Sequence, residues 1–508
     1  MSSYNSGFYF YPLYVIMAYR KQVWGLMMLN KDSIRPKNSV KTRMMMRVNT
    51  FSERYPRGYL CTALVLMLPG YFFLFLFPWF AFEGISVLVE ELPSMNTAEY
   101  GLMGQGLTTA VWLLVIVLCL FFSLKIFQLR FPRVQGLRMS KELAPALYSL
   151  IAGVRELTRR PTIKDVVLTD QYELYIDATP RLGFPFLMSN TLVIGMPMLQ
   201  TLSEAQFRGE VMRRLGQCAS GRFRPTHWIY RTRLLWCRYQ DALQKRKRIS
   251  ELPLRWFFSF YAPLFAGFTV PAARRDELAA DVAVLEWLND RDYFETVKSS
   301  AIAEVFLDTC FWRKLYQSLR KNAQITSHVK SDVLSPFEKL EHISGHLKSK
   351  EFRRKCLQEA IAEEQNIFNV APVLRTRMDN IGQSKLRDVP IVEKTAATAC
   401  VGNARKNYVL IIDKLWRSTT FAHWRAAEKQ QRVDIQTVKA LSQKSRRRIL
   451  GVKEMLSYAQ IAKRLRGDSL RSSLRKIVKR NFRHLWAASL SWSVFQRKQK
   501  TTPPNDIF

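Results

Sequence analysis

The sequence has few of the residues and motifs that hydrolases use in their active sites. Only 6 of its 508 residues are histidine, and none stands in an H-E-x-x-H pattern. Its 7 cysteines form no C-x-x-C pair, which argues against a cysteine-bound zinc, and we interpret them as reduced thiols. The chain also lacks the G-x-S-x-G elbow of serine hydrolases and a phosphate-binding P-loop. These absences exclude several common enzyme classes.

Acidic side chains are scarce relative to basic ones. The 78 Lys and Arg outnumber the 41 Asp and Glu, and the net charge is +37. Such a field favours polyanionic partners, namely anionic lipid headgroups, nucleic acid or an acidic protein surface. The mean hydropathy of -0.12 indicates that only part of the chain lies in a membrane. At this length we expect two or three domains.

Two long charge-free runs stand out, residues 58–82 and 100–124. Each has roughly the 20 residues that cross the hydrocarbon core of a bilayer, so we expect a transmembrane hairpin. The segment 83–99 between them carries four Glu and no basic residue, whereas Arg57 and Lys125 belong to basic outer flanks. By the positive-inside rule the acidic loop lies outside and both termini lie in the cytoplasm. We expect this membrane to be a bacterial inner membrane.

Two further apolar segments are too short to cross a bilayer. Residues 8–19, within the basic N-terminal segment 1–57, are expected to dock at a membrane interface or on the core. Residues 255–268 are interrupted by Pro263 and are expected to form a buried or interfacial helix. The N-terminus shows no secretory signal, because its basic residues follow the apolar run. The expected anchor is therefore the hairpin at 58–124.

Between residues 125 and 382 the pattern combines helices with a few short strands. An amphipathic helix is predicted over 141–160 by four apolar residues at helical spacing, Leu143, Leu147, Ile151 and Val154. Two strands within 165–178 and a third at 191–194 predict a small sheet, with a loop over 180–185. Further helices are predicted over residues 228–248, 273–288 and 338–364.

The most informative stretch is 191–221, where a strand and a loop lead into a helix opened by Ser203. On this helix Arg213, Arg214 and Gln217 have the spacing of the His, Glu and His of a zinc-binding H-E-x-x-H helix. There, two imidazoles hold the metal and the Glu acts as general base. Arginine neither ligates zinc nor accepts a proton, and glutamine is a poor zinc ligand. We therefore expect no catalysis at these positions.

Five segments give this interpretation its context. GLRMSKELAPALYSLI, NTLVIGMPMLQTLSEAQFRGEV, FYAPLF, ARRDELAAD and APVLRTRMDNIG resemble the membrane zinc metallopeptidases of the HtpX and CAAX-prenyl-protease type, peptidase family forty-eight. The resemblance covers roughly half of the chain and implies a zincin-like domain over residues 125–382. In this family the third zinc ligand is the Glu of an E-x-x-A-D motif, which is retained here as Glu277 with Asp281.

The family's downstream element, His-Pro-Pro-Leu-x-x-Arg, is retained only in part, as Ala371, Pro372, Leu374 and Arg377. Its His is lost, like the helix ligands, so the resemblance implies a degenerate and inactive member without a cofactor. Zinc enters only in the alternative of an enzyme with divergent ligands. His342 and His346 are the one His pair with metal-like spacing, and we interpret them as a solvated surface pair.

Without a metal, Glu277 is left as a partly buried carboxylate that lacks a counter-charge, which is costly. We expect the guanidinium of Arg213 or Arg214 to pair with it. Asp281 or Gln217 then takes the remaining donors. In the alternative, the arginines face solvent and Glu277 lines a wet cleft.

The last quarter of the chain is strongly basic. Residues 383–508 hold 28 Lys and Arg against 8 Asp and Glu, a net of 28 − 8 = +20. We expect a helical extension over 383–441 and a basic amphipathic region over 442–508. A cationic helical face within this region suits an anionic membrane surface, a partner helix or RNA. Its cations are Arg471, Arg475, Lys476, Lys479, Arg480 and Arg483.

The sequence thus predicts a mainly α chain with a small β-sheet, which combines a hairpin anchor, a zincin-like metallopeptidase domain and a helical C-terminal extension. The expected function is that of a membrane-anchored pseudopeptidase. It would bind, scaffold or regulate a protein partner or a larger membrane assembly at the cytoplasmic face, in contact with membrane lipids. The alternatives are an active membrane zinc endopeptidase with divergent ligands and a membrane-tethered nucleic-acid-binding protein.

Overall fold

The computed structural model describes most of the chain between residues 40 and 461. The described residues are 40–94, 102–158, 163–181, 184–220, 224–246, 248–325, 335–343, 347, 349–382, 390–447, 454, 457, 458, 460 and 461. The chain divides into two compact units, with a boundary between Trp416 and Arg417. This boundary falls inside the segment 383–441 that we expected to be one extension. The protein is mostly helical and has one small mixed sheet, as the sequence predicted.

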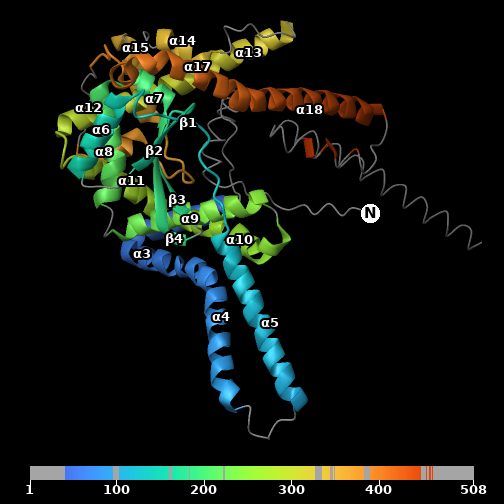
Figure 1. Cartoon of the computed structure of the whole chain (residues 1–508). Helices are drawn as coiled ribbons and strands as arrows, with labels where there is room; N and C mark the ends of the chain where they lie inside the picture. Colours follow the sequence, from blue (N-terminus) through green and yellow to red (C-terminus); the bar gives the residue numbers. More distant parts are fainter. Residues whose placement is uncertain are drawn as a thin grey trace, which may run out of the picture. The chain divides into compact units, whose positions relative to one another are not determined.

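Among the described residues, the first unit contains all of the strands and most of the helices (Figure 1). Its first half consists of α2 (Val40–Arg54), α3 (Pro56–Val65), α4 (Leu68–Ser94), α5 (Leu102–Phe127), β1 (Leu137–Arg138), α6 (Pro145–Thr158), β2 (Ile163–Thr169), β3 (Leu174–Arg181), β4 (Phe184–Gly195), α7 (Met196–Thr201), α8 (Glu204–Ser220) and α9 (Pro225–Arg246). Its second half consists of η2 (Ile249–Glu251), α10 (Leu252–Phe268), α11 (Val270–Val284), α12 (Asp290–Val305), η3 (Phe306–Trp312), α13 (Arg313–Ile325), α14 (Pro336–Ile343), α15 (Lys350–Ala362), α16 (Leu374–Asn380), η6 (Ala397–Val401), η7 (Gly402–Ala404) and α17 (Arg405–Trp416).

Helices α4 and α5 form the predicted hairpin and lie side by side, projecting from the rest of the unit (Figure 1). The apolar stretches Pro56–Glu90 and Thr109–Ile126 are long and apolar enough to cross a membrane. The prediction of an acidic loop over 83–99 was wrong in extent, because α4 continues to Ser94 and takes Glu83 and Glu90 with it. Glutamate is a good helix former, so the change in charge did not mark the end of the helix.

The sheet has the strand order β1-β2-β4-β3, with β2 parallel and β3 antiparallel to β4. This confirms the predicted strands, but the predicted loop over 180–185 was wrong. Both Pro180, in β3, and Pro185, in β4, belong to the strands. Proline is tolerated there because β3 is an edge strand, and because β4 pairs with β2 only from Asn190 onward.

Two predicted helices differ from those observed. Helix α6 buries Leu147, Ile151 and Val154 as expected, but it begins at Pro145, and Leu143 precedes it and is exposed. Proline is well suited to the first position of a helix, which explains the late start.

The predicted helix over 338–364 is instead two helices, α14 and α15. Helix α14 ends at Ile343, and Ser349 caps α15 by accepting a hydrogen bond from the Phe352 N–H. A serine at such a position starts a new helix more readily than it continues one.

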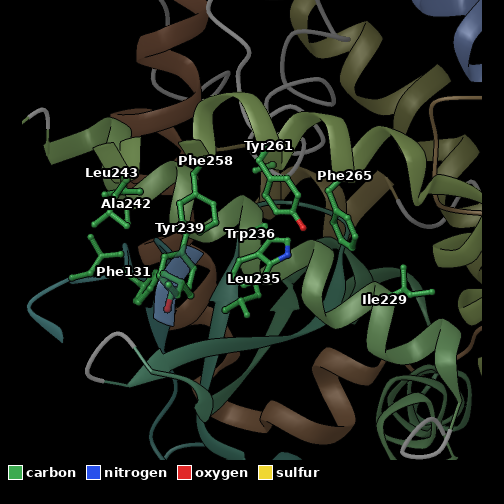
Figure 2. Close-up of a cluster of buried hydrophobic side chains, with 14 of the residues drawn as sticks. Phe131, Ile229, Leu235, Trp236, Tyr239, Ala242, Leu243, Phe258, Tyr261 and Phe265 are labelled. Atoms are coloured by element: carbon green, nitrogen blue, oxygen red, sulfur yellow. The ribbon is translucent and has the colours of Figure 1, made fainter. Parts of the chain in front are cut away.

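An aromatic cluster joins the base of the hairpin to the domain. Trp236 and Tyr239 of α9 pack against Phe258, Tyr261 and Phe265 of α10 (Figure 2). The hairpin adds further rings, because Phe73 of α4 stacks on Phe257 of α10 with ring centroids 4.0 Å apart. A Cβ at Gly70 of α4 would lie 2.6 Å from the Trp236 ring, so only glycine allows this close approach.

Residues 255–268, expected to form a buried or interfacial helix, belong to α10, and one face of this helix is buried in the aromatic cluster. A bend of 55° separates α10 from α11. Arg274, Arg275 and Glu277 of α11 are charged, and most of this helix is buried inside the domain. We therefore treat α10 and α11 as domain helices rather than as a third span.

The second unit consists of η8 (Arg417–Phe421), α18 (Ala422–Arg447) and a few residues that follow. Tyr458 and Ile461 are buried in it. Helix α18 carries an ion pair between Glu428 and Arg432, one turn apart. Of the features predicted from the sequence, the basic residues from Arg471 to Arg483 and the apolar segment 8–19 lie outside the described residues.

Candidate functional site

Helix α8 begins with a reciprocal cap. The Ser203 N–H donates to Oε1 of Gln206 (3.0 Å), and the Gln206 N–H donates to Oγ of Ser203 (3.3 Å). This arrangement satisfies two of the free N–H groups at the start of a helix. One face of α8 buries apolar side chains such as Phe207 and Val211, as expected of a core helix. The predicted start at Ser203 is confirmed.

A second face of α8 is polar and also buried. Its members recur at helical spacing and are at most 6% exposed: Gln206, Glu210, Arg213 and Gln217. A helix buried on a polar face requires partners for each of its charged groups, because an unpaired buried charge is very costly. The carboxylates that pair with Arg213 and Gln217 come from α11.

The Glu277 carboxylate of α11 lies between two guanidinium groups. Its Oε2 is 2.8 Å from Nη2 of Arg213, and Nη1 of Arg214 donates to Oε1 and Oε2, each at 2.9 Å. The Tyr230 hydroxyl of α9 adds a hydrogen bond to Oε1 at 3.2 Å. The predicted pairing of Glu277 with Arg213 or Arg214 is therefore confirmed, since both arginines take part.

Asp281 lies one turn further along α11 and is fully buried. Its Oδ1 accepts from Nε of Arg213 at 2.6 Å and from Nη2 of Arg377 at 2.8 Å, while its Oδ2 accepts from Nε of Arg377 at 3.0 Å. The Tyr293 hydroxyl of α12 donates to Oδ1 at 2.6 Å. The two-point contact with Arg377 is the strong geometry for an arginine and a carboxylate.

Asp276 supplies the third carboxylate of the cluster. Its Oδ2 accepts from Nε2 of Gln217 at 2.9 Å and lies 3.1 Å from Nδ1 of His227. Oε1 of Gln217 accepts from Nη1 of Arg214 at 3.3 Å, so this amide bridges Asp276 and the arginines. We call these eight side chains the arginine–carboxylate network: Arg213, Arg214, Gln217, His227, Asp276, Glu277, Asp281 and Arg377.

The arginines keep the carboxylates ionised inside the domain. Burial alone would raise the pKa of Glu277, but Arg214 and Arg213 outweigh it and hold the pKa at about 2, below the ordinary 4.5. Burial opposes ionisation of Asp281 too, yet Arg213 and Arg377 lower its pKa below its ordinary value. Conversely, burial disfavours the charge on Arg213, but Asp281 and Glu277 raise its pKa well above the ordinary value. Glu277, Asp281 and Arg213 are therefore charged at neutral pH.

A divalent metal does not fit this set of side chains. Both oxygens of Glu277 already accept hydrogen bonds from guanidinium groups, and Arg213 and Arg214 would repel a second cation. Among the described residues, no group of three or more His, Cys, Asp or Glu side chains is placed to hold a metal ion. The absence of a cofactor remains a prediction.

The structure brings Arg377 of the downstream motif into the network but leaves the rest of that motif outside it. Leu374 is buried at the start of α16, Pro372 is half-buried, and Ala371 is exposed. His342 is exposed on α14, while His346 lies outside the described residues. The cationic residues expected at an anionic surface, from Arg471 to Arg483, also lie outside them.

Sequence reasoning missed four members or neighbours of the site: His227, Tyr230, Asp276 and Tyr293. A signal existed for Asp276, which directly precedes Glu277 on a helix with few other carboxylates. No local signal pointed to His227, Tyr230 or Tyr293, because they come from two other helices and meet α11 only through the fold.

Comparisons with known proteins add no relative. No protein-family model, no curated protein and no solved structure matches this chain.

Proposed function

We propose that this chain is a membrane-anchored pseudopeptidase, a binding protein built on a scaffold of the HtpX and CAAX-prenyl-protease type. The observation that supports the proposal is the pairing of Glu277 with Arg213 and Arg214. In the resembling enzymes, the corresponding three positions hold zinc and activate water. Here the side chains at these positions, Arg213, Arg214 and Glu277, form ion pairs with one another.

The chemistry of peptide hydrolysis argues for this assignment. A zinc peptidase needs a metal-bound water with a pKa near 7 and a base beside it. Arg214 stands where that base would be, and a guanidinium accepts no proton. Arg213 stands at the first ligand position and is 4% exposed, with its Nε and Nη2 committed to carboxylates. A site of this composition has neither the metal-bound water nor the base that zinc-dependent hydrolysis requires.

The proposed setting is the cytoplasmic face of a membrane, in bacteria the inner one. Its support is the helical hairpin with basic residues at its base, such as Arg54 in α2, Arg57 in α3 and Lys125 in α5. Basic residues next to a span favour the cytoplasmic side. We propose a protein partner or a larger membrane assembly as the ligand of the domain.

The proposed contact for that partner is the edge strand β3, which has β4 on one side only. An extended polypeptide can add to such an edge through main-chain hydrogen bonds. Pro180 limits the usable edge to the residues before it, because proline has no N–H to donate. Arg238 of α9 forms an ion pair with Asp177 and donates a hydrogen bond to Thr179. These two contacts attach β3 to α9.

The first experiment measures zinc and cleavage. Wild-type protein, purified without chelator or metal-affinity resin, is compared with the variant Arg213→His/Arg214→Glu/Gln217→His. We expect near-zero zinc per chain in the wild type and near one in the variant, because the variant restores two imidazoles and a base next to Glu277. Stoichiometric zinc in the wild type, or cleavage of an unfolded polypeptide that chelator abolishes, would overturn the proposal.

A second experiment tests binding. A photo-crosslinking residue is placed at Ala178 on β3, and reduced, carboxymethylated lactalbumin serves as an unfolded probe. We expect crosslinks from Ala178 and none from Leu157, an exposed control position on α6. Equal crosslinking at both positions would show that β3 is not the contact.

A further inference from the structure

Helix α10 has a second apolar face that the aromatic cluster does not use. With η2 it exposes five large apolar side chains, Ile249, Leu252, Trp256, Phe260 and Leu264. They recur every three or four residues and therefore form one stripe along the helix. Ile249, Trp256 and Phe260 are 83%, 78% and 71% exposed, which is more than most single surface apolar residues. We call these five residues the α10 stripe.

The helix that carries the α10 stripe packs on the hairpin that is apolar enough to cross a membrane. Phe257, next to Trp256, stacks on Phe73 of α4 with an interplanar angle of 6°. The Tyr261 hydroxyl donates to the carbonyl of Leu66, which lies between α3 and α4 within the apolar stretch Pro56–Glu90. In Figure 1, α10 lies at the domain end of the hairpin, near α5. The stripe therefore begins where the hairpin leaves the domain.

At the bend after α10, backbone carbonyl and N–H groups are hydrogen-bonded to side chains inside the domain. Arg233 of α9 donates to the Ala266 carbonyl, and the Tyr59 hydroxyl donates to the Phe268 carbonyl at 2.9 Å. Tyr59 also accepts from the Ala272 N–H at 3.1 Å. Satisfying the freed groups internally allows the end of a helix to approach lipid, where water cannot satisfy them.

The charges around the stripe match a membrane surface. Arg255 is the one charged residue of α10, and it is half-buried beside Trp256. Lys245 and Arg248, just before the stripe, are exposed. An apolar stripe with tryptophan and flanking cations is typical of a helix lying in the headgroup region, where long basic side chains reach the phosphates.

We propose that the α10 stripe is embedded in the leaflet on the domain side of the hairpin, so that α10 lies along the membrane surface. The occupant is lipid rather than a second copy of the chain, because α10 packs through Phe257 on α4, and α4 is apolar enough to cross a membrane and itself exposes Phe72 and Trp79. This inference rests on the membrane anchor of the proposed function and is independent of the fate of the zinc site. The domain is thereby held against the bilayer at a second point.

The test uses tryptophan quenching by spin-labelled lipid. The full chain is placed in nanodiscs that hold one chain each, with phosphatidylcholine labelled either near the headgroup or near the end of the acyl chain. Wild type is compared with Trp256→Phe and Trp79→Phe, two conservative changes at exposed side chains. We expect Trp256→Phe to remove emission that the shallow label quenches, and Trp79→Phe to remove emission that the deep label quenches.

Each outcome decides one point. If Trp79→Phe reduces quenching and Trp256→Phe leaves it unchanged, the hairpin stands and the α10 inference is wrong. If neither variant changes the quenching, the membrane anchor itself fails, and with it the proposed setting. Quenching of Trp256 that is present in discs with one chain and disappears in discs with two would assign the stripe to a second copy and overturn the lipid contact.

Discussion

The arginine–carboxylate network and the aromatic cluster are both buried, but they hold the first unit together by different physics. In the network, Asp281 contacts Arg213 and Arg377 through directed hydrogen bonds of 2.6–3.0 Å. In the aromatic cluster, rings such as Trp236 and Phe258 lie with centroids 5.5 Å apart and interplanar angles that vary from pair to pair. The first specifies partners, and the second mainly removes apolar area from water.

This difference predicts that the free energy of unfolding responds differently to loss of a side chain from the network and from the aromatic cluster. A buried charge that loses its partner pays the full cost of desolvation, and neighbouring groups cannot relax to recover it. A cluster of rings can partly collapse around a lost side chain, so its loss is smaller and does not depend on pH. The network is therefore the more fragile of the two, although it is the smaller.

The largest expected effect comes from removing Asp281. Asp281→Ala leaves Arg213 and Arg377 short of a buried counter-charge, and we expect the free energy of unfolding to fall by about 3–5 kcal/mol. Denaturant titration of the detergent-solubilised protein measures it. Glu286→Ala, an exposed carboxylate just beyond α11, is the matched control and should change stability by less than about 0.5 kcal/mol. Equal losses in the two variants would refute the pairing.

The corresponding change in the aromatic cluster is Phe258→Ala. Phe258 is 0% exposed, and we expect a loss of about 3 kcal/mol, at the lower end for such truncations because neighbouring rings can move. The same titration measures this loss. Phe260→Ala, on the exposed face of the same helix, should have little effect in detergent. The comparison fails if the exposed ring proves as important to folding as the buried one.

A smaller effect tests the packing behind the network. Gly216 lies on α8 between Arg213 and Gln217, and a Cβ there would lie 2.6 Å from the Trp287 ring. Gly216→Ala should therefore destabilise by about 1–2 kcal/mol, since overpacking exceeds the gain of about 1 kcal/mol in helix propensity. Gly153→Ala on α6, where the added methyl meets open space, should stabilise. Opposite signs in thermal melts would confirm the contact, and equal signs would contradict it.

Another expected effect is a change in pH dependence. The pKa of Glu277 is lowered to about 2 from 4.5, so its charge stabilises the fold above pH 4.5, and this stabilisation is lost as pH falls toward 2. Glu277→Gln removes the titrating group and should flatten this part of the stability profile. Phe258→Ala should shift the profile down without changing its slope. Parallel profiles for wild type and Glu277→Gln would contradict the assignment.

Much of the site followed from the sequence because its signals are local. The spacing of Arg213, Arg214 and Gln217 on one helix, and of Glu277 and Asp281 on another, placed each set on one helical face. The charges of Arg213, Arg214 and Glu277 then required counter-charges, which led to the predicted pair. His227 and Tyr293 were not predicted, because they bond to residues of another helix and such a pairing produces no periodic pattern in the sequence.

For the fold, the presence of the main elements was predictable, but their ends were not. The hairpin and the three main strands have strong composition signals, and the structure contains them. The ends were not predictable, as in α4, which continues through Glu90, and in the break between α14 and α15. Helix ends depend on capping and packing that single-residue preferences resolve poorly.

The sequence by itself determined two chemical features: two apolar runs long enough for a membrane, and a helix on which Arg213, Arg214 and Gln217 stand at the H-E-x-x-H spacing without a histidine. Residue types and spacing are sufficient for both, because hydropathy and metal coordination depend on the side chains themselves. Only the tertiary structure decided that Arg377 and Arg213 share Asp281, and that the apolar residues of α10 divide between a buried face and an exposed stripe. Pairings between helices distant in the chain arise from how α8, α11 and α16 pack, and burial depends on what each face of a helix meets.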